Sequence, residues 1–205
     1  MQYGQADSAL IIFLRLPISG KVKTRIAATE GDDHALAIYL QLMDITLELA
    51  ANAEKPVYLF FEGGLPELSA RQPGYIYLPQ SSGDLGKKMA DAFSLVLQNH
   101  AKAVLIGSDC PTLSKVILNK AFSQLDQDDI ILGPSSDGGY YLIGCKIPHP
   151  EIFNGITWST PSVLESTIQR IRKEKLTFSL LEELVDIDTA ADWHQYKQNN
   201  TGLRS

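Results

Sequence analysis

The sequence predicts an α/β domain of three layers, in which a doubly wound and mostly parallel sheet lies between two layers of helices. Short runs of branched apolar residues alternate along the chain with segments whose apolar residues recur every three or four positions. Because neighbouring parallel strands need a crossover, this alternation is typical of βαβ units. The 205 residues contain no repeat, linker or low-complexity segment, so we expect a single domain over residues 1–205.

Up to residue 100 the sequence predicts three strands and two helices. The run ALIIFLRL is short, branched and apolar and is followed by Pro17, which suits a buried, central strand better than a helix. Apolar residues then recur at three- and four-residue steps, which is the pattern of an amphipathic helix. The segments are, in order, strand 9–16, helix 35–53, strands 56–61 and 75–78, and a helix marked by Met89, Phe93, Val96 and Leu97.

Beyond residue 100 the sequence predicts four more strands and three more helices. Each strand is short and apolar and runs into a loop that contains glycine, proline or a carboxylate. Ser114 precedes a segment with helical spacing, a position that suits a helix cap. The segments are, in order, strand 104–106, helix 114–125, strands 130–132 and 140–143, helix 160–173, strand 177–181 and a helix after Asp188.

The charge and cysteine content restrict the class of protein. With 18 Lys and Arg against 24 Asp and Glu, the net charge of −6 argues against a general nucleic-acid binder, because duplex binding depends on clustered basic residues. Only Cys110 and Cys145 are present, so neither a disulfide framework nor a zinc cluster is expected. The apolar run 9–16 contains Arg15 and is too short to span a bilayer. We therefore expect a cytoplasmic protein without a membrane segment.

The loop at 17–25 (PISGKVKTR) concentrates positive charge directly before a helix in an otherwise acidic chain. Backbone donors and the helix dipole favour anions at such a position. Arg25 can make a two-pronged contact with a phosphate, and Lys23 can act as a point charge. We expect both side chains on an exposed loop, and a solvated basic turn is the alternative. The Gly-Lys-Ser/Thr ending of a P-loop is absent.

Two carboxylates follow expected strands at loops rich in glycine or proline. Asp109 lies in GSDCP just past an apolar strand, where it either holds a cation or caps the turn that begins at Cys110. Asp137 lies in SSDGG, and the two glycines permit a turn with positive φ. A plain hairpin and a substrate-binding loop therefore both explain Asp137.

The segment 186–192 (DIDTAAD) puts three carboxylates around an expected helix start. Asp188 is either a functional carboxylate or the helix N-cap, and Thr189 could serve as the cap equally well. Trp158 fits either a core position or a position that stacks on a sugar. The four histidines show no metal-ligand spacing.

Six motifs occur in order over nearly the whole chain: PxxGxVKTR, QxxGDLGxxM, GSDCPTL, LGPxxDGGYYLIG, FxGIxWST and DIDTxxD. Together they resemble a bacterial family of nucleotide-diphospho-sugar transferases of uncharacterised substrate, assigned in part to arsenosugar biosynthesis. The resemblance implies a GT-A-like fold and glycosyl transfer. The chain also resembles small nucleotidyltransferases, including 2-phospholactate guanylyltransferases with a Lys-Ser/Thr-Arg-Leu loop and cytidylyltransferases with an Asp-Ile-Asp-Thr-Pro-Glu-Asp tail.

These resemblances imply a role for each loop. Lys23 and Arg25 would contact phosphates, and Gln80 and Gly83 would lie by the base. Gly83 and Gly86 would let the nucleotide approach the backbone closely. Asp109 and Asp188 would hold a divalent cation, and their oxygen ligands favour Mg²⁺ or Mn²⁺ over zinc. The implied nucleotide-binding residues are Pro17, Gly20, Lys23, Arg25, Gln80, Gly83, Asp84, Gly86 and Ser108.

The leading hypothesis is a metal-dependent glycosyltransferase that uses a nucleotide-sugar donor and a small-molecule acceptor. Asp137 is the candidate for acceptor binding or for the general base. A nucleotidyltransferase acting on a phosphorylated small molecule is the first alternative, and a non-catalytic nucleotide-binding accessory protein is the second. We expect no nucleic acid or membrane partner, and the sequence leaves monomer and homodimer open.

Overall fold

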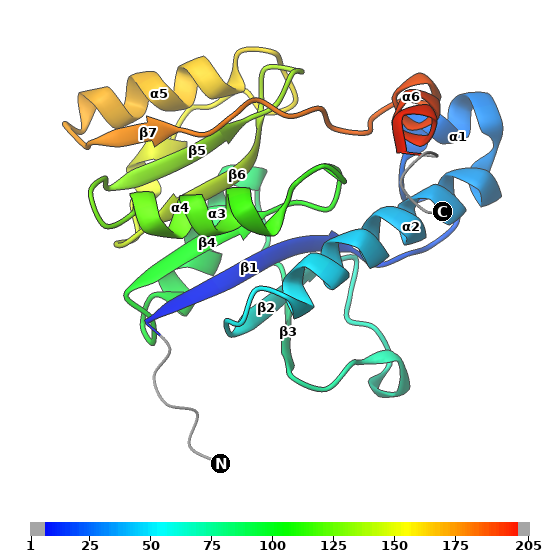
Figure 1. Cartoon of the computed structure of the whole chain (residues 1–205), viewed down its shortest axis with the longest axis horizontal. Helices are drawn as coiled ribbons and strands as arrows, with labels where there is room; N and C mark the ends of the chain where they lie inside the picture. The colour runs from blue at the N-terminus through cyan, green and yellow to red at the C-terminus, as the bar shows by residue number, and fades with distance from the viewer. Residues whose placement is uncertain (1–6, 201–205) are drawn as a thin grey trace.

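The computed structural model describes residues 7–200, which form a seven-stranded sheet with helices on both faces (Figure 1). The strands are β1 (Ser8–Arg15), β2 (Val57–Glu62), β3 (Tyr75–Pro79), β4 (Lys102–Ile106), β5 (Ile130–Pro134), β6 (Tyr140–Cys145) and β7 (Phe178–Leu180). Their spatial order is β3-β2-β1-β4-β6-β5-β7. β1 pairs in parallel with both β2 and β4, which confirms the predicted central strand.

One strand breaks the parallel arrangement. β6 is antiparallel to both β4 and β5, whereas β2 with β3 and β5 with β7 are parallel pairs. The short connection at 135–139 explains this, because strands joined by a tight hairpin must run in opposite directions. The doubly wound, mostly parallel sheet that the sequence predicts is therefore confirmed.

The helices cover the two faces of the sheet and one of its ends. They are α1 (Thr24–Glu30), α2 (Asp32–Ala51), α3 (Leu85–Val96), α4 (Lys115–Gln124), α5 (Val163–Lys173) and α6 (Ala190–Asn200), with the 3₁₀ turns η1 (Leu68–Ala70) and η2 (Pro150–Phe153). One apolar cluster joins α2 and α4 to the sheet, and a second joins α3 and α5 to its other face. A third cluster packs α1, α2 and α6 together beside the sheet.

Burial on both faces explains why β1 reads as a continuous apolar run. Leu10 and Ile12 face the cluster beneath α2 and α4, while Ala9 and Ile11 face the cluster beneath α3 and α5. All four side chains are fully buried. Parallel strands covered on both sides lack the alternation of polar and apolar residues that marks a half-exposed strand.

The sequence-based prediction missed α1 and thereby extended the loop at 17–25 too far. The helix begins at Thr24, so Arg25 lies in its first turn. Its N-cap, Lys23, has a left-handed backbone conformation and makes no side-chain cap hydrogen bond, so the usual start signal is absent. Ile26 is fully buried against α2 and α6, and this tertiary contact fixes the helix.

Other boundaries shift by a few residues. α2 begins at Asp32 rather than at 35, α5 begins at Val163 rather than at 160, and Ser114 caps α4 as expected, accepting a hydrogen bond from the Ile117 amide at 3.3 Å. No helix among residues 7–200 is long and apolar enough to cross a membrane.

We predict that Phe93→Ala lowers the free energy of unfolding by about 3–5 kcal/mol, because its ring is 1% exposed and its loss leaves a cavity between α3 and the sheet. Urea denaturation measures the change. Leu68→Ala is the control, since that side chain is 80% exposed and its removal should change stability by about 0.5 kcal/mol or less. Equal losses in the two variants would contradict this account of the core.

Candidate functional site

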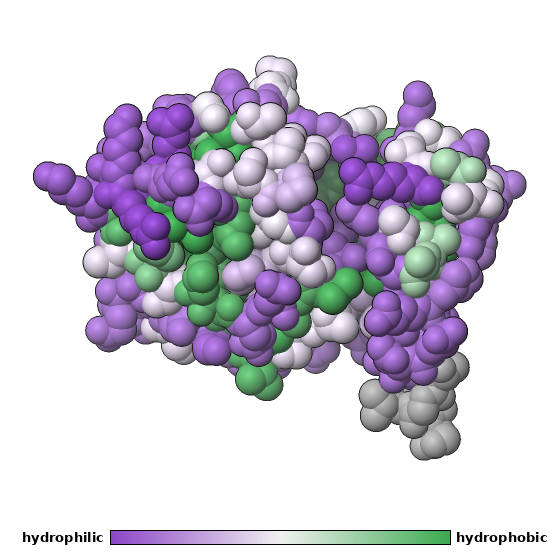
Figure 2. All heavy atoms as spheres, turned by 90° about the horizontal axis from the view of Figure 1, so that it is seen from above, coloured by the Kyte–Doolittle hydropathy of each residue, from purple (hydrophilic) through white to green (hydrophobic). Residues whose placement is uncertain are grey.

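A cavity of about 890 Å³ opens where the parallel strands β1, β3 and β4 end. This is the edge at which ligands bind in open α/β sheets, because loops and helix N-termini converge there. The molecular surface seen from above is hollowed and lined with hydrophilic residues between the end of the sheet and the α1–α6 side (Figure 2). The polar lining residues include Lys23, Arg25, Gln80, Asp84, Ser108, Asp109, Asp137, Asp186 and Asp188.

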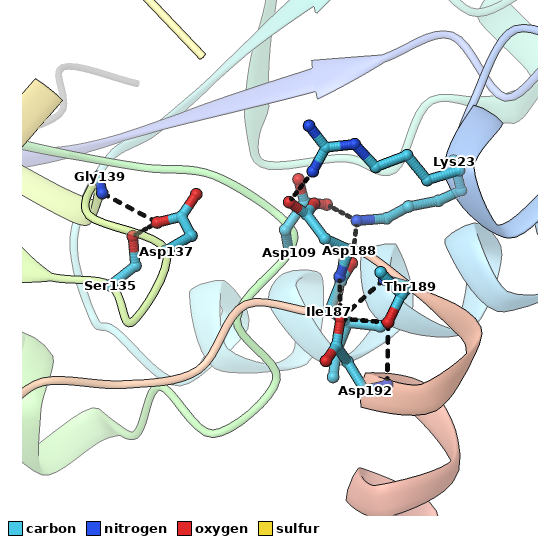
Figure 3. Close-up of polar contacts among 10 residues, drawn as sticks. Lys23, Asp109, Ser135, Asp137, Gly139, Ile187, Asp188, Thr189 and Asp192 are labelled. Carbon is cyan, nitrogen blue, oxygen red and sulfur yellow. Dashed lines mark hydrogen bonds and ion pairs between the residues drawn. The ribbon is translucent and has the colours of Figure 1, made fainter. Parts of the chain in front are cut away.

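Lys23 reaches into the cavity rather than into solvent. Its Nζ lies 2.7 Å from Asp109 Oδ1 and donates a 2.5 Å hydrogen bond to the Ile187 carbonyl oxygen (Figure 3). The side chain is only 7% exposed. The expectation that Lys23 lies on an exposed loop is therefore wrong, because an ammonium with a carboxylate and a carbonyl as partners can be enclosed at low cost.

Arg25, in the first turn of α1, makes a similar ion pair. Its Nη1 lies 3.0 Å from Asp188 Oδ2, and both side chains are partly exposed. The Ile187 amide donates a 2.8 Å hydrogen bond to the Asp109 carbonyl, which fastens the C-terminal segment to the loop after β4. Asp109 and Asp188 are thereby brought side by side across nearly eighty positions of sequence, each with one cation from the first loop (Figure 3).

Asp188 is not the N-cap of α6. Thr189 takes that role, since its Oγ1 accepts from the Asp192 amide at 3.3 Å. In return Asp192 Oδ2 accepts from the Thr189 amide at 2.7 Å and from its hydroxyl at 2.8 Å. This reciprocal pair is a capping box, and it leaves the Asp188 carboxylate free to face the cavity.

Asp186 is a site residue that the sequence reasoning left unassigned. Burial, together with the neighbouring carboxylates of Asp109 and Asp137, raises its pKa to about 7, while a hydrogen bond from Ser135 opposes the rise. A signal was present in the sequence: in an extended segment, residues i and i+2 share a side. Ile187 packs into the apolar cluster of α1, α2 and α6, so the two aspartates beside it face the other way.

Asp137 lies in the hairpin between β5 and β6, on the far side of the cavity from Lys23 (Figure 3). Its Oδ1 accepts hydrogen bonds from the Ser135 hydroxyl at 2.5 Å and from the Gly139 amide at 2.9 Å. These two hydrogen bonds stabilise the turn, as the plain-hairpin interpretation expects. Asp137 nevertheless lines the cavity, so the structural and functional interpretations are compatible.

The wall of the cavity beside Asp137 comes from the loop before α5. Trp158, Ser159 and Thr160 line it. The indole packs directly on the first turn of α3, where a Cβ on Gly86 would lie 2.7 Å from the ring. The Trp158 Nε1 atom is enclosed without a hydrogen-bond acceptor among the described residues. Trp158 is therefore neither an ordinary core residue nor an exposed one.

The remaining predicted nucleotide contacts divide into two groups. Gln80 lines the cavity and donates from Nε2 to the carbonyls of Leu14 and Phe60 at 3.2 and 3.1 Å, which fixes it at the strand ends. Asp84 caps α3 by accepting from the Lys87 amide at 2.8 Å, and Ser108 is buried. Four predicted contacts lie outside the cavity lining of residues 7–200, and these are Pro17, Gly20, Gly83 and Gly86.

Carboxylates outnumber cations in the lining of the cavity. Within the described residues, six carboxylates and four cations line the cavity, a formal charge of −2 when all are ionised. Each of these cations already has a carboxylate partner: Lys23 with Asp109, Arg25 with Asp188, and both Arg15 and Lys88 with Glu62. In the same part of the chain no three His, Cys, Asp or Glu side chains group closely enough to hold a metal ion. A metal ion bound in the cavity would therefore need oxygen atoms of a bound ligand to complete its coordination.

Residues 43–160 match a protein family described as "Uncharacterized protein conserved in bacteria (DUF2064)". The chain belongs to this DUF2064 family. A search of curated proteins found no significant match.

Solved structures share the fold of this DUF2064 protein. The crystal structure of a provisionally assigned nucleotide-diphospho-sugar transferase from Desulfovibrio desulfuricans G20 has a TM-score of 0.90 at 28% identity, over 97% of this chain and 90% of that one. Rv0371C of Mycobacterium tuberculosis H37Rv, in complex with manganese, has a TM-score of 0.56 at 14% identity, over 93% and 97%. A 4-diphosphocytidyl-2C-methyl-D-erythritol synthase from Anaerococcus prevotii DSM 20548 has a TM-score of 0.63 at 8% identity, over 96% and 97%. The last two likenesses concern the fold alone.

We predict that the contribution of Asp186 to the stability of the metal-free DUF2064 protein falls as the pH rises from about 4 to about 7. The pKa of Asp186 is raised from its ordinary value of 3.8 to about 7, so in this window the unfolded chain has lost a proton that the folded protein retains. Asp186→Asn removes this contribution. Urea denaturation between about pH 5 and about pH 8 should show the variant gaining stability relative to wild type as the pH rises. A difference that stays constant over this range would refute the assignment.

We also predict that the wall beside Asp137 depends on Gly138. A Cβ there would lie 2.1 Å from the Pro161 carbonyl oxygen, and φ is +88°. Gly31 is a matched control, because its φ is +87° and its added Cβ meets nothing within 4 Å. Gly31→Ala should cost about 1–3 kcal/mol of backbone strain, and Gly138→Ala about 1–3 kcal/mol more through the clash. Equal unfolding free energies for the two variants would contradict the proposed packing.

Proposed function

We propose that the protein is a metal-dependent glycosyltransferase that takes a nucleotide-diphospho-sugar donor. The observation that carries this proposal is the convergence of Lys23 and Arg25 with Asp109 and Asp188 at one edge of the sheet. Two cations suit the oxygens of a diphosphate, and two carboxylates suit a hard divalent cation. The likeness to the Desulfovibrio protein supports the same class of substrate.

The residues on this side of the cavity would bind and orient the diphosphate. Lys23 and Arg25 would contact its oxygens, and Gln80 would lie beside the nucleoside. Asp109 and Asp188 would hold Mg²⁺ or Mn²⁺, with phosphate oxygens and water as the remaining ligands. Bound there, the ion would neutralise charge on the leaving nucleoside diphosphate. Rv0371C, which shares the fold, has been crystallised with manganese.

The opposite wall would receive the acceptor. Trp158 offers part of its ring, and Ser159 and Thr160 offer hydroxyl groups, which suits a hydroxylated molecule. In the transfer, an acceptor hydroxyl oxygen forms a bond to the anomeric carbon, and the bond from that carbon to the diphosphate oxygen breaks. Asp137 would accept the hydroxyl proton through Oδ2, because hydrogen bonds from Ser135 and Gly139 already engage Oδ1.

Nucleotidyl transfer is the rival reaction, since the same cations and carboxylates could orient a nucleoside triphosphate. There an oxygen of a phosphorylated substrate attacks the α-phosphorus and pyrophosphate leaves. Incubation with nucleotide sugars, and separately with triphosphates and sugar phosphates, distinguishes the two. Release of nucleoside diphosphate supports glycosyl transfer, and release of pyrophosphate supports the rival. Nucleotide binding that needs no metal, without either release, would favour an accessory protein.

We predict that Asp109→Asn and Asp188→Asn each lower metal-stimulated turnover by about 100-fold or more, because each removes a carboxylate proposed to hold the metal ion that neutralises the leaving diphosphate. The melting temperature of the ligand-free protein should fall by no more than a few degrees, since Thr189 and not Asp188 caps α6. Asp33→Asn is the control, an exposed carboxylate outside the cavity that accepts from Ser19. Full activity of Asp188→Asn would remove it from the site.

A further inference from the structure

The Lys23 ammonium lies between the groups proposed to hold the divalent cation. It contacts Asp109 Oδ1 at 2.7 Å and the Ile187 carbonyl at 2.5 Å, directly before Asp188 in the chain (Figure 3). A second cation cannot approach Asp109 closely while the ammonium stays, because like charges at short range repel. The protein therefore carries its own cation at this position when no ligand is bound.

The surroundings hold Lys23 firmly in this place. Its side chain is 7% exposed, whereas the Arg25 side chain that pairs with Asp188 is 67% exposed. Shielded ion pairs are screened less by solvent and salt than exposed pairs are. The left-handed backbone of Lys23, with φ of 47° and ψ of 47°, turns its side chain out of line with α1 and toward Asp109.

We propose that Lys23 couples the two ligands by exchanging partners. In the ligand-free protein it neutralises Asp109, and when a metal–diphosphate complex enters, its ammonium moves to the phosphate oxygens and leaves the carboxylate to the metal. Either ligand alone leaves one charge uncompensated. Metal alone displaces the Lys23 ammonium without offering it a new anion. Diphosphate alone draws the ammonium away and leaves the Asp109 carboxylate without a cation. This inference rests on the proposed metal site at Asp109 and Asp188.

The coupling gives one variant opposite effects on two ligands. Removing the ammonium frees Asp109, so Mn²⁺ alone should bind more tightly. The same change removes a phosphate contact, so a preformed Mn²⁺–pyrophosphate complex should bind more weakly. A residue with only a structural role would weaken both. Coupling energies between ligand sites typically correspond to factors of about 5 to 150, so we expect about a 10-fold change in each direction.

The test measures Mn²⁺ binding to the whole protein by electron paramagnetic resonance, and binding of Mn²⁺–pyrophosphate by calorimetry. Pyrophosphate serves as a probe that carries no base or sugar. Lys23→Met removes the charge at similar length, and Lys23→Gln removes it while keeping a donor for the Ile187 carbonyl. Lys21→Met is the matched control, because Lys21 is an exposed lysine of the same loop that does not line the cavity.

The expected result is tighter Mn²⁺ and weaker Mn²⁺–pyrophosphate binding in both Lys23 variants, with both affinities unchanged in Lys21→Met. Unchanged or weaker Mn²⁺ binding in a folded Lys23 variant would overturn the coupling. An equal gain in Mn²⁺ affinity in Lys21→Met would also overturn it, because the gain would then follow from the change in net charge alone.

A double variant separates this inference from the proposed function. Lys23→Met with Asp109→Asn should lose the gain in Mn²⁺ affinity. If the double variant keeps that gain, the ion binds elsewhere and the metal site itself is wrong. If wild type binds Mn²⁺–pyrophosphate through Asp109 but Lys23→Met leaves Mn²⁺ affinity unchanged, the site stands and only the coupling fails.

Discussion

The burial of β1 on both faces is the constraint from which the rest of the architecture follows. Fully buried side chains alternate toward two separate apolar clusters, so helices must cover each face. A strand enclosed in this way can carry polar function only beyond its end. The first charged residue of β1 is Arg15, its last residue, and the basic loop follows directly. The same holds for β4, whose buried run leads to Asp109.

The cavity depends on a second constraint, the attachment of the C-terminal segment to the loop after β4. A single backbone hydrogen bond, from the Ile187 amide to the Asp109 carbonyl, aligns the two segments. Burial of the Ile187 side chain beside α1, α2 and α6 then directs its two aspartate neighbours toward the cavity. Packing on one side of the segment and charge on the other are thus consequences of the same extended backbone.

Seven of the ten charged groups that line the cavity are in ion pairs. The four lining cations each contact a carboxylate, which leaves Asp84, Asp137 and Asp186 without a cation partner in the lining, and the pKa of Asp186 is raised to about 7 by burial and by neighbouring carboxylates. Under the proposed function, a diphosphate and a divalent metal ion would bind among these groups.

Local sequence patterns determined the fold class, the central place of β1 and most element boundaries, because apolar periodicity and helix caps are properties of short segments. They also indicated which loops carry charge. They did not reveal α1, which lacks a capping signal and depends on the burial of Ile26 against two other helices. They also misjudged Lys23, since no local pattern shows that a lysine will meet a carbonyl 164 positions away.

The tertiary structure decided whether each polar residue has a structural role, a functional role or both. Thr189 rather than Asp188 caps α6, and the Asp137 turn is a hairpin that also borders a cavity. Gly86 makes room for the Trp158 ring instead of facing the cavity. Sequence by itself determined which residues are available and where strands end. Only the folded chain decided which of them meet, because contacts between distant segments depend on how the helices pack over the sheet.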